Sequence, residues 1–328
     1  MNTAGAAALA LLLAVLPVCA SGQSGDAARN YPNRPITLVV PFSPGTGIDI
    51  LARTIGPRLV ERWKQPVIVD NKPGASGNIG SDIVAKAAPN GHTLMVTVNT
   101  FALAPALYKN LPFDPATDFA AVGKIALGTY ALTINPSVVP AVNLGEALAS
   151  VKSRPGKMNY GSPGSGTPQH VVMELLKLRL GLDMVHVPYK GAAGATTDLL
   201  SGQLHMMFLP AHTALPHIGS GRLRILAVTG SARSALVPDV PTFQEQGIDF
   251  MDIELWYGVL APSRTPPDII AKLNQEIISI MGLPEVRDSL IKQGLVSTTG
   301  KPEEFAALIR SDLARWKKIV DDANITAD

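Results

Sequence analysis

The chain has 328 residues, a formal net charge of +2, and 16% charged residues beside 46% hydrophobic ones. This composition, without a collagen-like period, excludes an intrinsically disordered protein, a coiled coil and a fibre. The near-neutral charge balance and the lack of a Lys/Arg run argue against a nucleic-acid-binding protein, because such a protein needs a clustered basic surface. The length predicts about two domains, each large enough to bury its own core.

The N-terminus predicts export. Residues 1–20 carry no charged side chain, and the segment from Ala4 to Val18 is almost continuously apolar. This segment is shorter than the roughly 20 residues that span a bilayer, so it is typical of a cleavable signal peptide. The alternative, lipoprotein processing at Cys19, lacks the small residue expected just before such a cysteine. Cleavage after Ala20 would leave no cysteine, and the exported protein could form no disulfide.

Strands and helices alternate along the rest of the chain. Apolar runs predict strands at 36–40, 67–69 and 94–98, with helices at 48–63 and 78–88 between them. This order is typical of parallel βαβ units with right-handed crossovers. The pattern then restarts, with predicted strands at 158–161, 184–187, 204–209 and 223–229 and helices at 169–180 and 195–200.

The C-terminal part is more helical. Thr265-Pro266-Pro267 predicts the start of a helix, because proline is well tolerated in a first turn. Two helices there carry apolar stripes that we expect in the core, Ile269, Ile270, Leu273, Ile277 and Ile280 in one and Phe305, Leu308, Ile309, Leu313, Trp316 and Val320 in the other.

Three glycine-rich loops follow predicted strands, at the edge where open α/β sheets place ligands. They cover residues 42–47, 74–80 and 161–167, and each leads into a predicted helix. Backbone N–H groups and a helix N-terminus suit an anion such as a carboxylate. The alternative is that these glycines only allow tight turns, but three loops at equivalent positions favour binding.

No motif predicts catalysis. The loop at 161–167 lacks the dinucleotide-binding spacing, no loop ends in Gly-Lys-Ser/Thr, and residues 74–78 lack the second glycine of a hydrolase elbow. The histidines lack zinc-site spacing, and no acidic pair is spaced for general acid–base work. We therefore expect no catalytic residue, no metal and no cofactor. An exported two-lobed protein with anion-binding loops and no catalytic group is typical of a receptor.

Several segments carry a family resemblance that extends over essentially the whole chain after the signal peptide. Among them are Tyr31–Ile36, Val39–Phe42, Asp70–Gly74, Val185–Gly191 and Pro238–Thr242. The chain resembles the Bug family, the extracytoplasmic receptors of tripartite tricarboxylate transporters. The resemblance implies an α/β type II periplasmic-binding-protein fold, in which two domains joined by two crossing strands enclose a ligand cleft. We expect domain 1 at residues 31–125 plus 229–328 and domain 2 at residues 126–228.

The resemblance also implies where a ligand binds. The family pocket is built from the loops that correspond to residues 42–49 and 162–167, whose backbone and hydroxyl donors hold a ligand carboxylate. Uncharged donors suit this task, since preorganised N–H groups bind a carboxylate without desolvation of an arginine. The predicted ligand-binding residues are Phe42, Ser43, Gly45, Thr46, Gly47, Asp49, Ser76, Asn78, Ser162, Ser165, Gly166, Thr167, His170, Tyr189 and Leu209.

The sequence departs from the family pattern in and near these loops. Ser43, Thr46 and Ile48 replace Pro, Gly and Thr of the common first loop, and Pro163 removes one N–H donor from the other. Many members carry Asp-Asn after Phe208, where this chain has Leu209-Pro210. If that Asp holds a ligand amino group, its absence argues against a zwitterionic ligand here.

The predicted function is that of a periplasmic receptor. It captures a small organic carboxylate, as a monomer and without a cofactor, and delivers it to the membrane permease subunits of a tripartite tricarboxylate-type transporter. The alternative function is a periplasmic sensor subunit that feeds a signalling kinase. A secreted enzyme is the least supported possibility, because no catalytic set is present. No nucleic-acid partner is expected.

Overall fold

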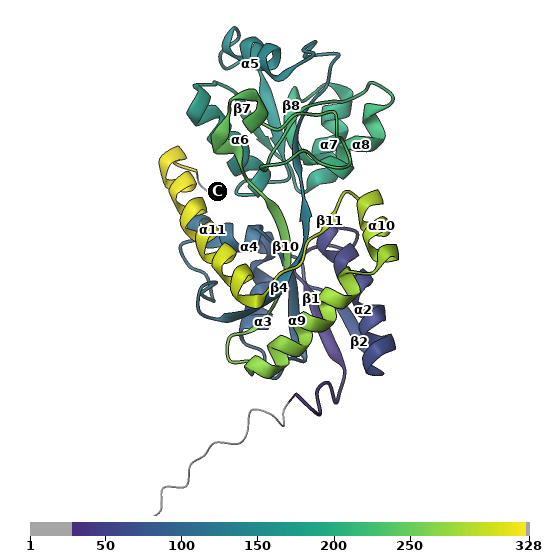
Figure 1. Cartoon of the computed structure of the whole chain (residues 1–328). Helices are drawn as coiled ribbons and strands as arrows, with labels where there is room; N and C mark the ends of the chain where they lie inside the picture. Colours follow the sequence, from purple (N-terminus) through teal and green to yellow (C-terminus); the bar gives the residue numbers. More distant parts are fainter. Residues whose placement is uncertain (1–27, 326–328) are drawn as a thin grey trace, which may run out of the picture.

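The computed structural model describes residues 28–325, which form two α/β lobes, each built on its own sheet (Figure 1). The signal peptide predicted for residues 1–20 lies outside the described residues. Within those residues, no helix has the length and apolar character that crossing a membrane requires.

The first sheet combines parallel and antiparallel strands. In spatial order it contains β11 (Val296–Ser297), β4 (Phe119–Gly128), β10 (Leu255–Pro262), β3 (Thr93–Val98), β1 (Ile36–Val40) and β2 (Val67–Asn71). Strand β1 pairs in parallel with β2 and β3, which confirms the predicted βαβ units. Strand β10 runs antiparallel between β3 and β4, so the C-terminal half of the chain completes this sheet.

The second sheet contains β7 (Val185–Pro188), β6 (Asn159–Ser162), β8 (Met206–Pro210), β5 (Tyr130–Ile134) and β9 (Arg224–Val228) in spatial order. The four strands predicted between residues 158 and 229 are confirmed to within two residues at their ends. Strand β6 is parallel to β7 and β8, whereas β5 runs antiparallel to β8 and β9.

Helices cover both sheets. Those of the first lobe are α2 (Gly47–Trp63), α3 (Asn78–Ala85), α4 (Thr100–Leu107), α9 (Pro267–Met281), α10 (Pro284–Lys292) and α11 (Pro302–Ala323). Those of the second lobe are α5 (Leu144–Lys152), α6 (Pro168–Leu180), α7 (Ala192–Ser201) and α8 (Ala211–Ile218). Short 3₁₀ turns occur elsewhere in the chain, at Ala75–Gly77, Gln244–Gln246 and Asp249–Met251. The predicted apolar stripe of α9 is buried throughout, and that of α11 is buried except for the partly exposed Leu308 and Leu313.

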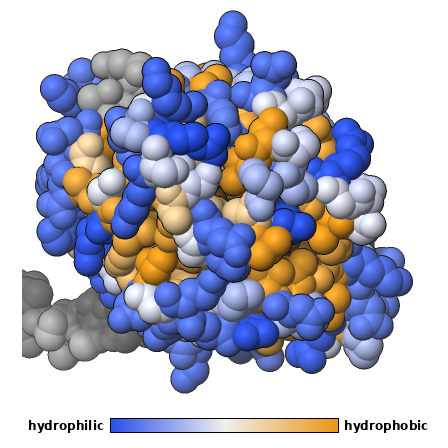
Figure 2. All heavy atoms as spheres, turned by 90° about the horizontal axis from the view of Figure 1, so that it is seen from above, coloured by the Kyte–Doolittle hydropathy of each residue, from blue (hydrophilic) through white to orange (hydrophobic). Residues whose placement is uncertain are grey.

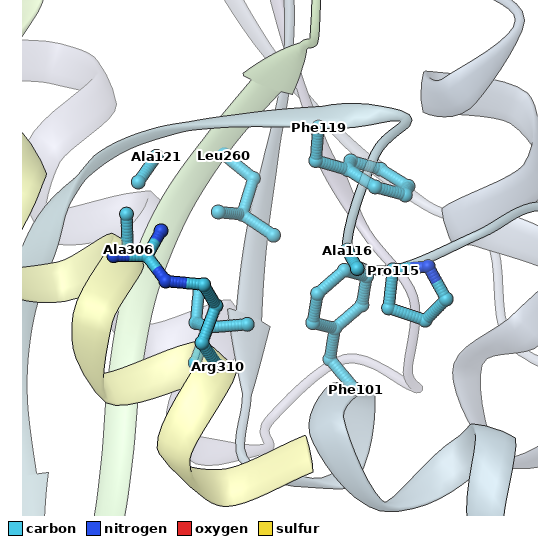
Figure 3. Close-up of a pocket in the computed structure, with 9 residues that line it drawn as sticks. Phe101, Pro115, Ala116, Phe119, Ala121, Leu260, Ala306 and Arg310 are labelled. Atoms are coloured by element: carbon cyan, nitrogen blue, oxygen red, sulfur yellow. The ribbon is translucent and has the colours of Figure 1, made fainter. Parts of the chain in front are cut away.

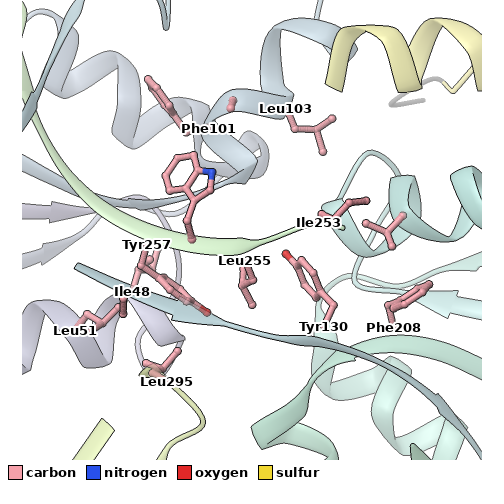
Figure 4. Close-up of a cluster of buried hydrophobic side chains, with 14 of the residues drawn as sticks. Ile48, Leu51, Phe101, Leu103, Tyr130, Phe208, Ile253, Leu255, Tyr257 and Leu295 are labelled. Atoms are coloured by element: carbon pink, nitrogen blue, oxygen red, sulfur yellow. The ribbon is translucent and has the colours of Figure 1, made fainter. Parts of the chain in front are cut away.

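The lobes share contacts beyond the chain that links them. Helix α11 packs on α4 and β4 of the first lobe and also reaches α6 of the second (Figure 1). One hydrophobic cluster extends across the junction, where Tyr130 and Phe208 of the second sheet lie near Leu255 and Tyr257 of the first (Figure 4). The two lobes are therefore packed together at the crossing, the region where the chain passes from one sheet to the other.

The connection between the sheets fixes which edges face each other. Strand β4 ends at Gly128 and β5 begins at Tyr130, so a single residue, Thr129, joins the two sheets. The carboxyl ends of β1, β3 and β4 lie at one edge of the first sheet, because Gly128 pairs with Leu255 at the start of β10. The carboxyl ends of β6 and β8 lie beside the start of β5 in the second sheet. The loops after β1 and β6 therefore begin at the two sheet edges that lie on either side of Thr129, where the chain crosses from one sheet to the other. The exact domain boundaries stay a prediction.

Candidate functional site

The first loop connects β1 to α2 and is braced from within by Asp49. The Asp49 carboxylate accepts hydrogen bonds from the Gly45 N–H at 2.8 Å, from Arg53 Nε at 3.0 Å and from Asn71 Nδ2 at 3.0 Å. Burial by itself raises the pKa of Asp49, but these hydrogen bonds outweigh burial and hold the pKa below its usual range. Asp49 is 2% exposed. In this structure it shapes the loop.

The N-terminus of α2 has no side-chain cap. Thr46 occupies the N-cap position, but its hydroxyl donates to the Ser43 carbonyl at 3.0 Å and does not cap the helix. The first-turn amides of this 17-residue helix have no partner within the helix. Their partial positive charge suits an anion.

Gly47, the first residue of α2, lies against Tyr257 of β10. A Cβ at Gly47 would lie 2.8 Å from the Tyr257 hydroxyl oxygen and 3.1 Å from two ring carbons. Burial raises the pKa of Tyr257 above its usual range, so its hydroxyl stays protonated at neutral pH. Tyr257 therefore brings a hydroxyl donor to the start of α2.

Substitution of Gly47 by Ala is expected to lower the melting temperature by several degrees, because overpacking of a buried contact costs about 1–3 kcal/mol. Y257F is expected to recover part of this loss, since it removes the nearest atom. Gly45 provides a matched control: its φ is +83° and nothing lies within 4 Å of a Cβ there. The loss in G45A comes from backbone strain, so Y257F should not recover it. Thermal unfolding of the three single variants, G47A, G45A and Y257F, and of the two double variants checks this. If Y257F raised the melting temperatures of G47A and G45A equally, the proposed contact between residue 47 and Tyr257 would be wrong.

The second loop connects β6 to α6 and folds around Gly164. The Gly164 carbonyl accepts hydrogen bonds from the hydroxyls of Ser162 at 3.0 Å and Thr167 at 2.8 Å. The Gly166 N–H donates to His170 Nδ1 at 3.0 Å. Thr167 is the N-cap of α6, and again its side chain does not cap the helix. The second lobe therefore also presents an uncapped helix N-terminus.

The structure brings most of the predicted site residues to these two loops. Phe42, Ser43, Gly45, Thr46, Gly47 and Asp49 belong to the first loop and the start of α2, and Ser162, Ser165, Gly166, Thr167 and His170 belong to the second loop and the start of α6. Several have internal partners: the Gly166 N–H serves His170, and the hydroxyls of Thr46 and Thr167 serve loop carbonyls. Amides of the two helix starts remain for a ligand; at α6 they are those that follow Pro168, which has no N–H.

The other four predicted residues lie outside these two loops, although the Tyr189 N–H donates to the Ser162 carbonyl of the second loop at 3.1 Å. Ser76 accepts a hydrogen bond from the Tyr108 hydroxyl at 3.0 Å, and Asn78 begins α3 with 7% exposure. The Tyr189 hydroxyl donates to Asp198 at 2.5 Å. Leu209 is fully buried in a hydrophobic cluster of the second lobe and offers no surface to a ligand. Their assignment as ligand-binding residues stays a prediction.

Two tyrosines at the crossing were missed by the sequence analysis. The Tyr130 hydroxyl donates to Asn99 Oδ1 at 3.3 Å, and Asn99 Nδ2 donates to the Glu254 carbonyl at 2.9 Å. Burial raises the pKa of Tyr130, as it does that of Tyr257. In Figure 4 the hydroxyls of the two tyrosines point into the same region of the crossing, with Leu255 between them. No local motif marks either residue, because each acts through a distant neighbour in the fold.

Other surface features fit a small ligand less well. A cavity of about 80 Å³ lies beneath α11, with Phe101, Phe119, Leu260 and Arg310 in its lining (Figure 3). Small-molecule sites usually enclose about 300 Å³ or more, so this cavity is too small. Seen from the second-lobe end, the surface has apolar areas interrupted by hydrophilic residues (Figure 2). The two helix N-termini are therefore the better candidate site.

Comparison with known families identifies relatives along most of the chain. Residues 51–325 match the model of the tripartite tricarboxylate transporter family receptor, TctC. The protein BugT of Bordetella pertussis is 34% identical over 295 residues, which cover 89% of this chain and 90% of BugT. A protein encoded in the tcbD-tcbE intergenic region of Pseudomonas sp. strain P51 is 34% identical over 299 residues, covering 91% of this chain and 89% of that protein.

Solved structures of similar proteins share the architecture. R. palustris Rpa4515 with adipate has a TM-score of 0.82 and 32% identity, covering 90% of this chain and 99% of that one. MatC from Rhodopseudomonas palustris with bound malate has a TM-score of 0.78 and 31% identity, covering 88% of this chain and 100% of that one. The periplasmic binding protein BugD has a TM-score of 0.79 and 30% identity, covering 90% and 99%. The predicted periplasmic-binding-protein fold is confirmed.

Proposed function

Because the chain belongs to the receptor family of tripartite tricarboxylate transporters, we propose that it captures a small dicarboxylate in the periplasm and delivers it to membrane permease subunits. The family consists of solute-binding receptors and is not an enzyme family. Structures of its members include periplasmic binding proteins, two of them with adipate and malate. Both ligands carry two carboxylates. Export through the signal peptide at residues 1–20 is part of the proposal.

The observation that carries the proposal is the pair of uncapped helix N-termini, one in each lobe. Helices α2 and α6 begin after loops that leave the two sheet edges adjoining the crossing. One carboxylate of the ligand binds the first-turn amides of α2, and the other binds those of α6. One chain supplies both helix ends, which fits a receptor that works as a monomer.

The charged side chains at the start of α2, Asp49 and Arg53, offset each other, so an anion there is held by neutral donors. Arg53, close to the first loop, is already paired with Asp49 at 3.0 Å. Attraction therefore comes from the helix N-termini and from donors such as the Tyr257 hydroxyl, which burial keeps protonated. A ligand that bridges the lobes binds their closed arrangement more tightly than an open one, and it therefore shifts the protein toward the closed arrangement.

Binding is tested by thermal shift and calorimetry on the mature chain with adipate, malate, hexanoate and adiponitrile. We expect both dicarboxylates to raise the melting temperature, since a ligand present at a hundredfold excess over its Kd stabilises by about 2.7 kcal/mol. Hexanoate, which keeps one carboxylate, should bind more weakly, and adiponitrile, which keeps none, should not bind. Equal shifts with adipate and adiponitrile, or no shift with any carboxylate of the panel, would contradict the proposal.

A further inference from the structure

Three aromatic rings form a stack behind the second loop. Strands β6 and β7 place Tyr160 beside His186, with ring centroids 4.8 Å apart and planes at 17°. His170, from the first turn of α6, stacks on His186 with centroids 3.9 Å apart and planes at 9°, and its centroid lies 6.4 Å from that of Tyr160. His170 is 7% exposed. No spacing in the sequence pairs the two histidines; the fold brings them together.

Each histidine is hydrogen-bonded to the second loop. His170 Nδ1 accepts from the Gly166 N–H, which requires an unprotonated Nδ1. His186 Nε2 lies 2.7 Å from the Ser162 hydroxyl oxygen. Ser162 has one proton, and its hydroxyl also lies 3.0 Å from the Gly164 carbonyl. All partners are satisfied when His186 Nε2–H donates to Ser162 and Ser162 donates to Gly164. The hydrogen bonds therefore assign a neutral His170, and they need no second proton on His186.

The surroundings also favour neutral rings. Among the described residues, the charged groups that act on the pair are Glu174 and Lys177 of α6, which are bonded to each other at 2.6 Å. Strand β6 adds the neutral Tyr160, whose hydroxyl donates to Glu174, and β8 adds apolar methionines beside β6. Burial, together with the neighbouring His170, lowers the pKa of His186 to about 4, and burial also lowers the pKa of His170.

We propose that His170 and His186 are positioning residues of the carboxylate site: as stacked, neutral rings they hold the second loop in the shape that presents the α6 N-terminus to the ligand. This inference rests on the proposed function for its effect on binding. Protonation of His170 Nδ1 removes the acceptor for Gly166, and protonation of both rings places two cations in stacking contact. The second loop therefore loses its support in acid.

The first test uses no ligand, because carboxylate ligands titrate in the same pH range as the stack. Long-range ¹H–¹⁵N NMR spectra of the full chain at pH 7 should show both rings neutral, with His170 Nδ1 unprotonated. His186 should titrate near pH 4. Its folded pKa lies below its unfolded value, so stability is unaffected above about pH 6.5 and is lost as the pH falls toward 4. A cationic ring at pH 7, or a proton on His170 Nδ1, would overturn the proposal.

The second test compares matched variants at pH 7.5. Asn places an amide oxygen near the position of imidazole Nδ1, so H170N keeps an acceptor for Gly166 and H170L does not. Gln similarly replaces Nε2 in H186Q, and H186L does not. We expect H170L to bind adipate about tenfold more weakly, as loss of one hydrogen bond predicts. The adipate affinity of H170N should stay within about threefold of that of the wild type, and H186Q should bind adipate more tightly than H186L.

Amide exchange at Gly166 separates this inference from the proposed function. H170L should accelerate exchange of the Gly166 N–H about tenfold, and H170N should preserve most of its protection. This readout holds even if the wild type binds no dicarboxylate, in which case the proposed function fails and the role of the stack in the loop is still decided. Unchanged Gly166 exchange in folded H170L, or wild-type adipate affinity in that variant, would overturn the inference.

Discussion

Replacement of Thr167 by Asp is expected to lower the affinity for a dicarboxylate such as adipate by at least about a hundredfold. Thermal stability should change little, because the new helix cap offsets the lost hydrogen bond from the Thr167 hydroxyl to the Gly164 carbonyl. Thr167 occupies the N-cap of α6 in extended geometry, with φ −75° and ψ 155° and no side-chain cap. Asp is a preferred N-cap residue, so its carboxylate will bind the first-turn amides that we assign to the ligand. The substitution therefore places a permanent anion in the proposed anion site.

The size of this effect follows from electrostatics. Two unit charges 4 Å apart repel by about 4 kcal/mol at an effective dielectric constant of 20, about a thousandfold in affinity before the loss of the amides is counted. T167N is the matched control, because Asn also caps a helix but carries no charge. Calorimetry should show T167N between the wild type and T167D, with melting temperatures within a few degrees of each other. Adipate binding by folded T167D at wild-type affinity would refute the placement of the ligand.

Substitution of Gly258 by Ala is expected to give the largest loss of stability. Gly258 lies inside the buried strand β10, and a Cβ there would lie 2.1 Å from Phe305 Cζ. Phe305 cannot move freely, because it is 2% exposed and packs edge-on against Trp256 with ring centroids 5.2 Å apart. We expect a loss of about 3 kcal/mol, the upper part of the range for overpacked cores. At roughly 1.6 °C per kcal/mol for a chain of this length, the melting temperature should fall by about 5 °C.

A double-mutant cycle with F305L separates this clash from other effects at Gly258. F305L alone should destabilise by leaving space in the core. Combined with G258A, it should destabilise by clearly less than the sum of the two single variants, since the smaller side chain makes room for the new methyl group. Additive losses in thermal unfolding would show that the Phe305 contact does not limit the size of residue 258.

The sequence predicts the parallel strands well because each is a short apolar run between turn signals. Strand β10 was not predicted, although all eight of its residues are buried. Its apolar run contains Gly258 and ends at Pro262, two residues that usually disfavour a strand. The glycine is there because Phe305 packs against the backbone. Such a requirement comes from a residue distant in sequence, so no local pattern reveals it.

The candidate site, like the fold, is predictable from the sequence only where the signal is local. Glycine-rich loops before helices marked both helix N-termini, because that signal is local. The sequence could not separate ligand contacts from internal support: Asp49 braces the first loop, and His170 receives the Gly166 amide. Tyr257 and His186 were not assigned to the site, since each reaches it from another strand, β10 for Tyr257 and β7 for His186. Contacts of this kind become visible only in the folded chain.

In the proposed complex, one dicarboxylate bridges the N-termini of α2 and α6. The most direct measurement is an NMR titration of the ¹⁵N-labelled mature chain with adipate, following the backbone amides at the start of both helices. We expect the first-turn amides of α2 and of α6 to shift together, with one shared Kd, and neither group to shift with adiponitrile. Saturable binding of adipate that leaves the amides of either helix start unchanged would contradict it.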